Sequence, residues 1–186
     1  MKLVLASNSP RRKELLKNAG FDFVVVSSDY EEKSFTCDPY ITAKIFAEGK
    51  AKSVFNSLDD QKDFAVLGSD TVVFLEGKIL GKPKTEVEAR SMLLSLSNKT
   101  HTVVSGYAVI TKDKIISGYD ETLVTFNNLS KKEIDDYINS GLYKGKAGSY
   151  GIQDGYPLVK EYKGSLNNVI GLPTEKLIPI LNDLLK

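Results

Sequence analysis

The sequence is poor in the residues that build disulfides and histidine-based sites. Its 186 residues include one cysteine, Cys37, and one histidine, His101. A single cysteine excludes a disulfide within the chain and is typical of a reducing compartment. One histidine and one cysteine are too few ligands for a zinc site, and a His101–Cys37 nucleophile pair is the only thiol chemistry they leave open.

Long apolar runs and a charge excess are also missing. No apolar run approaches the roughly 20 residues of a membrane span, and the chain enters a strand without a signal-peptide pattern. The 25 Lys and Arg against 24 Asp and Glu give a net charge of +1, which argues against a long nucleic-acid groove but allows a local basic pocket. Glycine-rich loops of the Walker or Rossmann type are absent. We therefore expect a soluble cytoplasmic protein with neither membrane nor nucleic-acid polymer as partner.

What is present is typical of a globular α/β protein. The hydrophobic share of 41% and the charged share of 26% are ordinary, and no repeat or linker divides the chain. We expect a single domain over residues 1–186, with two lobes around a central cleft as an option. The mixed order of strand and helix patterns predicts a long mixed sheet flanked by helices.

The patterns also locate the elements. Strands are expected at 3–6, 21–26, 64–68, 71–75, 78–80, 102–111, 115–126 with a break at Gly118, 147–153 and 158–162. Helices are expected at 10–19, 38–54, 85–96, 130–140 and 174–184. Helix-start signals support three of these helices: Asp38-Pro39, Thr85-Glu88 and Ser130-Glu133.

The segment 7–13, Ser-Asn-Ser-Pro-Arg-Arg-Lys, is the most informative part of the chain. Ser9 suits an N-cap and Pro10 the first helical position. Three cations then follow in the first turn, where the helix dipole makes each unfavourable by about 0.3–1 kcal/mol. A bound anion, such as a polyphosphate, explains this arrangement; a solvated basic helix start is the alternative.

Four more polar residues stand at positions where ligands are often bound. Asp70 interrupts two apolar runs and is either a carboxylate on a pocket floor or an Asx-turn residue. Lys82 precedes a proline and projects from a rigid turn, or is a plain loop lysine. Lys50 follows Gly49, whose place inside a helix suggests close approach of backbone or ligand. Gln153 has an amide able to contact a base edge or simply face a turn.

These segments together resemble the Maf family of nucleoside triphosphate pyrophosphatases over essentially the whole chain. The matching segments are Leu5–Arg12, Gly68–Val73, Gly81–Pro83, Ser105–Tyr107, Lys146–Gln153 and Asn168–Pro173. Each is short, but their order and spacing together are specific. The resemblance implies an elongated mixed α/β fold shared with inosine triphosphatases.

The resemblance also assigns roles to residues. Asp70 matches the family's proposed proton acceptor. The positions that match substrate-binding residues are Ser7, Arg11, Arg12, Lys50, Thr71, Lys82 and Gln153. Of these, Arg11, Thr71 and Gln153 match positions linked to substrate choice. Arg12, Lys50 and Lys82 match phosphate-binding cations. Glu32, in the polar loop 27–34, matches a carboxylate that binds a divalent metal, Mg²⁺ or Mn²⁺, or orients water. Asp70 is left as a ligand of this metal or as the base.

The activity implied is cleavage of a nucleoside triphosphate into a monophosphate and pyrophosphate, as part of cleaning nucleotide pools. The Tyr-Gly-Ile-Gln sequence ending at Gln153 resembles the branch acting on dTTP and UTP. A 7-methyl-GTP specificity and a non-catalytic, nucleotide-sensing role in septum formation remain alternatives. A homodimer is left open by analogy with the family and by the frequency of twofold assemblies.

Overall fold

The computed structural model describes residues 1–32, 37–59 and 61–186. Within these ranges one mixed sheet runs in the order β2-β1-β3-β5-β6-β7, with β4 paired to β3. β1 is parallel to β2 and β3, and the other pairs are antiparallel. The strands are β1 (Lys2–Leu5), β2 (Phe23–Val25), β3 (Phe64–Leu75), β4 (Lys78–Leu80), β5 (Thr100–Ile110), β6 (Ile115–Phe126) and β7 (Val159–Lys163).

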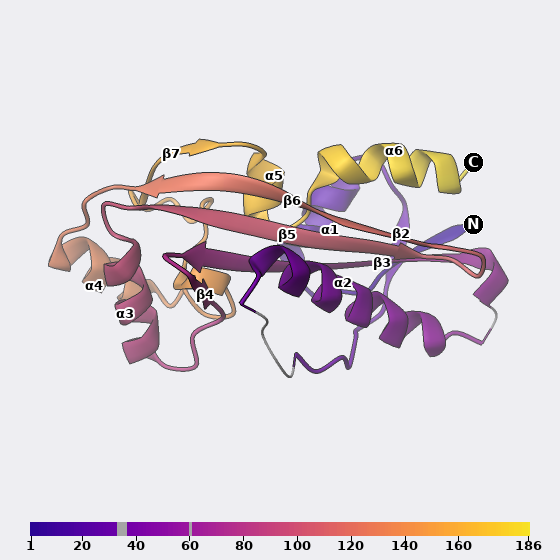
Figure 1. Cartoon of the computed structure of the whole chain (residues 1–186), viewed down its shortest axis with the longest axis horizontal. Helices are drawn as coiled ribbons and strands as arrows, with labels where there is room; N and C mark the ends of the chain where they lie inside the picture. The colour runs from indigo at the N-terminus through magenta and orange to yellow at the C-terminus, as the bar shows by residue number, and fades with distance from the viewer. Residues whose placement is uncertain (33–36, 60) are drawn as a thin grey trace.

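Helices flank this sheet along its length. The α-helices are α1 (Pro10–Asn18), α2 (Pro39–Asn56), α3 (Glu86–Leu96), α4 (Lys131–Ser140), α5 (Leu166–Ile170) and α6 (Thr174–Leu184), and two 3₁₀ turns are η1 (Gln61–Asp63) and η2 (Ala147–Ser149). Figure 1 shows an elongated molecule in which β3, β5 and β6 run along much of its length. The expected fold class, a mixed sheet flanked by helices, is confirmed.

Two separate parts of the core lie at opposite ends of β3. Its first half packs with β1 between two helical layers, because Ala65 and Leu67 face α1 and α6 whereas Val66 faces α2. Its second half, with Val73 and Leu75, packs against α3 and α4. Figure 1 shows these helices at opposite ends of the sheet. Asp70 thus lies between the two parts of the core. The prediction of a single domain with two lobes stays a prediction.

Close packing of α2 on the sheet depends on two glycines. A Cβ on Gly68 would lie 2.3 Å from the carbonyl oxygen of Ala47, and one on Gly106 would lie 2.1 Å from that of Ala43. Both positions face the α2 backbone, so any larger residue would push the helix off β3 and β5. Since α2 carries Lys50, these glycines set how near that lysine comes to the sheet.

Two sequence-based element predictions are wrong. Residues 147–153 form η2 and a turn instead of a strand, because Gly148 and Ser149 have φ of 67° and 66°, outside the extended region. Gly118 does not break β6, which pairs continuously with β5 on both sides of it. Its missing side chain makes room for Tyr107, whose hydroxyl would lie 2.6 Å from a Cβ at that position.

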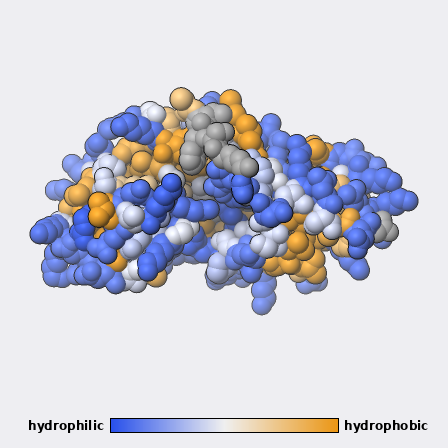
Figure 2. Space-filling view, turned by 90° about the horizontal axis from the view of Figure 1, so that it is seen from below, coloured by the Kyte–Doolittle hydropathy of each residue, from blue (hydrophilic) through white to orange (hydrophobic). Residues whose placement is uncertain are grey.

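One face of the molecule shows the mixture of polar and apolar side chains that the composition of the chain predicts. The face shown in Figure 2 is mostly hydrophilic, with smaller hydrophobic patches between the polar side chains. Among the described helices, none combines the length and apolarity that crossing a membrane requires.

Candidate functional site

The N-terminus of α1 forms one wall of the site. Ser9 occupies the N-cap position as predicted, but its side chain makes no capping hydrogen bond. Its backbone N–H donates to the Ser7 hydroxyl over 3.2 Å. The first-turn N–H groups therefore have no capping side chain, which is the arrangement that suits an external anion.

Arg12 is held rigidly beside this wall. Its guanidinium donates to the carbonyl oxygen of Gly171 over 2.8 Å, and over 3.3 Å to each of the hydroxyls of Ser7 and Thr71. Burial lowers its pKa, and the negative charge of Asp70 partly opposes that shift. A guanidinium fixed by three partners offers its remaining N–H groups in one direction, as phosphate recognition requires.

A buried polar network supports Arg12 from behind. The Thr71 hydroxyl lies 2.7 Å from that of Ser105, which donates to the carbonyl oxygen of Asn168 over 2.8 Å. The Asn168 side chain is fully buried and bonds the Ser105 N–H, the Val103 carbonyl and the Thr122 hydroxyl. The Thr71 hydroxyl is therefore hydrogen-bonded to Arg12 on one side and, through Ser105, to Asn168 on the other.

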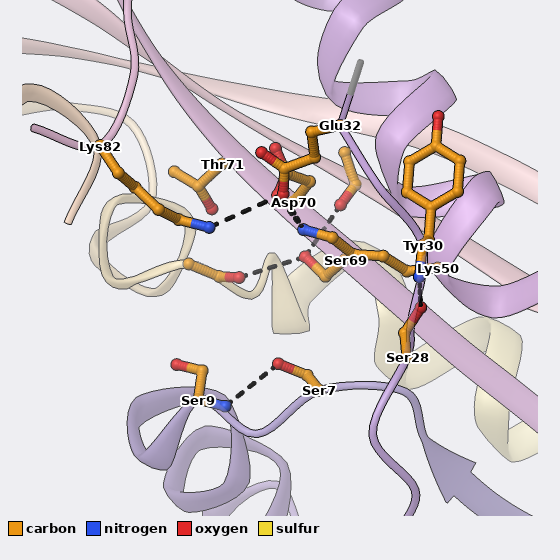
Figure 3. A network of polar contacts seen from close by, with 12 residues as sticks. Ser7, Ser9, Ser28, Tyr30, Glu32, Lys50, Ser69, Asp70, Thr71 and Lys82 are labelled. Atoms are coloured by element: carbon orange, nitrogen blue, oxygen red, sulfur yellow. Dashed lines mark hydrogen bonds and ion pairs between the residues drawn. The ribbon is translucent and has the colours of Figure 1, made fainter. Parts of the chain in front are cut away.

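Two carboxylates lie against the ammonium group of Lys50. Its ammonium forms ion pairs with Asp70 and, over 2.8 Å, with Glu32, while Lys82 lies 3.7 Å from Glu32. Figure 3 shows both lysine side chains pointing toward these carboxylates, with Ser7 and Ser9 on the α1 side. Burial works against ionisation of Glu32, but the hydrogen bonds and charges of Lys50 and Lys82 outweigh it and lower the pKa of the carboxyl.

Gly49 allows the loop that carries Glu32 to pack on α2. A Cβ at Gly49 would lie 2.3 Å from the Tyr30 ring, which also packs against Phe46 with ring centroids 6.2 Å apart. The close approach expected at Gly49 is thus an aromatic ring, not a ligand. Residues 33 and 34 of the predicted polar loop lie outside the described residues.

All nine residues singled out from the sequence line one cavity of about 410 Å³. They come from the β1–α1 loop, α1, the 27–32 segment, α2, β3, the β4–α3 loop and the 150–154 turn. The set is Ser7, Arg11, Arg12, Glu32, Lys50, Asp70, Thr71, Lys82 and Gln153. Their gathering in one place is a finding, whereas the role of each stays a prediction.

The sequence reasoning missed several residues of this cavity. Tyr30 and Asp154 belong to none of the matching segments, and Lys146 and Tyr150 stand only inside the segment Lys146–Gln153. All four line the cavity. Tyr150 also packs on His101 and Phe126, so it joins the cavity wall to the core.

Comparison with known proteins identifies the family of this chain. The family model described as "Maf-like protein" matches residues 2–184. The chain belongs to the Maf family. It is 47% identical to a dTTP/UTP pyrophosphatase of Clostridium acetobutylicum, covering 97% of this chain and 96% of that protein. It is 40% identical to a dTTP/UTP pyrophosphatase of Aquifex aeolicus, covering 99% and 96%.

A solved structure supports the fold of this Maf protein. A HAM1 protein from Coxiella burnetii matches it with a TM-score of 0.53 and 14% sequence identity, over 98% of this chain and 99% of that one. At this identity the likeness concerns the fold alone. It agrees with the elongated mixed α/β architecture expected from the sequence.

Proposed function

We propose that this Maf protein is a nucleoside triphosphate pyrophosphatase that hydrolyses dTTP and UTP to the monophosphate and pyrophosphate. The observation that carries the proposal is one cavity with cations on two sides of a buried carboxylate: Arg11 and Arg12 on α1, Lys50 and Lys82 opposite. A triphosphate carries about four negative charges and needs such a set for binding. The names of its relatives at 40–47% identity supply the substrate class.

The residues would divide the work as follows. Arg11, Arg12 and Lys82, with the amides of α1, bind the polyphosphate and stabilise charge on the leaving pyrophosphate. Asp70 orients water for attack at the α-phosphate and accepts its proton, a role worth roughly 10²–10⁴-fold in rate. Lys50 holds the Asp70 carboxylate in place through their ion pair.

The donor chemistry of the site fits a divalent cation, Mg²⁺ or Mn²⁺. Glu32 and Asp70 offer hard carboxylate oxygens that converge on one ammonium group. In the described parts of the chain, no three His, Cys, Asp or Glu residues are grouped to hold a metal on their own. Mg²⁺ commonly uses one or two carboxylates together with substrate phosphates and water, and when bound it would neutralise phosphate charge.

The uracil and thymine bases are assigned to the Gln153 side of the cavity. Their edge presents carbonyl, N–H and carbonyl, and the Gln153 amide can match two of these groups with its acceptor and its donor. The larger purine ring system would place its edge differently against the amide, which supplies discrimination. A cytoplasmic location, a homodimer and the absence of nucleic-acid polymers among the partners stay predictions.

A substrate panel tests the proposal. The purified protein is given each common nucleoside triphosphate and 7-methyl-GTP, with Mg²⁺ or Mn²⁺ and again with the metal chelated, and pyrophosphate release is measured. We expect the fastest release from UTP and dTTP, and loss of release on chelation. Faster cleavage of GTP or 7-methyl-GTP would overturn the substrate assignment, and no release from any nucleotide would favour a non-catalytic nucleotide sensor.

A further inference from the structure

The turn that carries Gln153 lacks the support of regular structure. It follows η2, where Gly148 and Ser149 both have positive φ, and it lies outside the sheet. Gln153 itself is exposed at the cavity. Because a selective contact needs a side chain held within a fraction of an ångström, something other than backbone pairing has to fix this turn.

A buried polar network connects the turn to α4. The Lys146 ammonium lies 2.6 Å from Asp154 Oδ1, and the Tyr137 hydroxyl donates to Asp154 Oδ2 over 2.6 Å. The same hydroxyl accepts the N–H of Gly151 over 3.1 Å. The side chains of Lys146 and Asp154 are only 9% and 12% exposed, so this ion pair is largely shielded from water.

Gly151 and Asp154 are also packed directly against each other. A Cβ at Gly151 would lie 2.6 Å from both carboxylate oxygens of Asp154, and the Asp154 N–H donates to the Gly151 carbonyl over 3.2 Å. The two residues that flank Ile152 and Gln153 are therefore fixed to one another and, through Tyr137, to a helix. Tyr137 in turn packs on Tyr156, with ring centroids 5.1 Å apart.

We propose that Tyr137, Asp154 and Lys146 are positioning residues for base recognition, fixing the 151–154 turn so that the Gln153 amide faces the nucleobase. The proposal rests on the proposed function, since it assigns the base to the Gln153 side. Burial and the bond to Asp154 raise the pKa of Tyr137, which keeps the hydroxyl a donor at any working pH. Among the described contacts, the cations proposed to bind phosphate form no hydrogen bond or ion pair with this network, so its loss should affect the base and spare the polyphosphate.

The variant Tyr137→Phe tests this, because it keeps the ring and removes the hydroxyl that joins Asp154 to Gly151. Binding is measured by calorimetry with uridine and guanosine triphosphate analogues whose α–β bridging oxygen is replaced by NH, and with inorganic pyrophosphate. We expect affinity for the uridine analogue to fall about tenfold, as for loss of a hydrogen bond to a charged group. Affinity for the guanosine analogue and for pyrophosphate should stay unchanged.

Two further variants make the test decisive. Asp154→Asn keeps the shape, removes the charge that Lys146 needs, and should give the same selective loss. Asp135→Asn is the matched control, because Asp135 lies on the same helix as Tyr137 and pairs with Arg90 outside the cavity. It should lower the melting temperature without changing the preference for uridine.

The outcomes separate the two proposals. Equal weakening of both analogues in Tyr137→Phe, no change in either, or the same loss in Asp135→Asn would overturn the positioning role. A wild-type protein that binds the uridine analogue but releases no pyrophosphate from UTP would contradict the proposed function and leave the positioning result intact. A wild-type protein that binds neither analogue would overturn both.

Discussion

At the scale of single residues, Asp70 is a deeply buried carboxylate with a cation in direct contact. The residue is 4% exposed in the middle of β3, and its carboxylate is paired with Lys50. Removing a charge from water costs several kcal/mol unless a partner compensates. A carboxylate in such a place stabilises the fold no better than an apolar residue would, and its presence at a cavity floor points to chemistry.

The variant Asp70→Asn should lower pyrophosphate release from UTP by about 10²–10⁴-fold, the range for loss of a general base. The fold should persist, because the amide keeps the shape and Lys50 retains Glu32 as a partner at 2.8 Å. Kinetics and circular dichroism measure the two effects. Glu121→Gln is the control, since Glu121 accepts a hydrogen bond from Tyr40 outside the cavity. Turnover that is unchanged in Asp70→Asn would refute the assignment.

At the scale of elements, α2 and the segment before it form one unit through Gly49. Glycine inside a helix costs about 1 kcal/mol relative to alanine. Here its missing side chain leaves the space that the Tyr30 ring occupies. Tyr30 stands two residues before Glu32, so the fit of an aromatic ring on a helix backbone determines where a carboxylate of the site lies.

Gly49→Ala should therefore lower activity although it improves helix propensity. The added Cβ would displace Tyr30 and with it Glu32, and misplacement by about 1 Å can cost up to about 100-fold in rate. Steady-state kinetics and urea unfolding would show reduced turnover without a matching loss of stability. In a Tyr30→Ala background the same change should have no further effect on turnover. An additive loss in the double variant would show that the ring is not the cause.

At the scale of the whole molecule, the one histidine has a structural role in the core. His101 is 2% exposed, and its Nε2 lies 2.7 Å from the hydroxyl of Tyr150, a residue of the cavity wall. Phe126 packs on its ring edge to face. Burial among these uncharged neighbours lowers the pKa of His101 to about 4, so it is neutral at physiological pH.

The free energy of unfolding should therefore fall in mild acid. Between the unfolded pKa of 6.5 and the folded pKa of about 4, the unfolded chain binds one more proton than the folded one, so stability decreases as pH falls. Between these two pH values the free energy of unfolding falls by about 3 kcal/mol. Urea unfolding from pH 7 to pH 4 should show it in the wild type. His101→Gln should remove this part of the pH dependence, and equal slopes in both proteins would contradict the assignment.

Much of the local structure could be predicted because its causes are local. Asp38 caps α2 by accepting the N–H groups of Tyr40 and Ile41, and Ser130 and Glu133 form a complete capping box. At the predicted helix start Thr85-Glu88, Thr85 accepts the Glu88 N–H as in a capping box. The Glu88 carboxylate accepts the Lys84 N–H and not that of Thr85. The strand expected at 147–153 was wrong because positive φ at Ser149 has no signature in residue type.

The sequence by itself determined the family, most of the strands and helices, and most of the charged residues that line the cavity. These follow from periodicity, capping chemistry and motifs, which act over a few residues. Only the tertiary structure decided which charges meet, that Tyr30 fills the space at Gly49, and that Tyr137 reaches Asp154 across 17 residues. Such contacts depend on how helices pack on the sheet, and packing is a property of the whole chain and not of any segment.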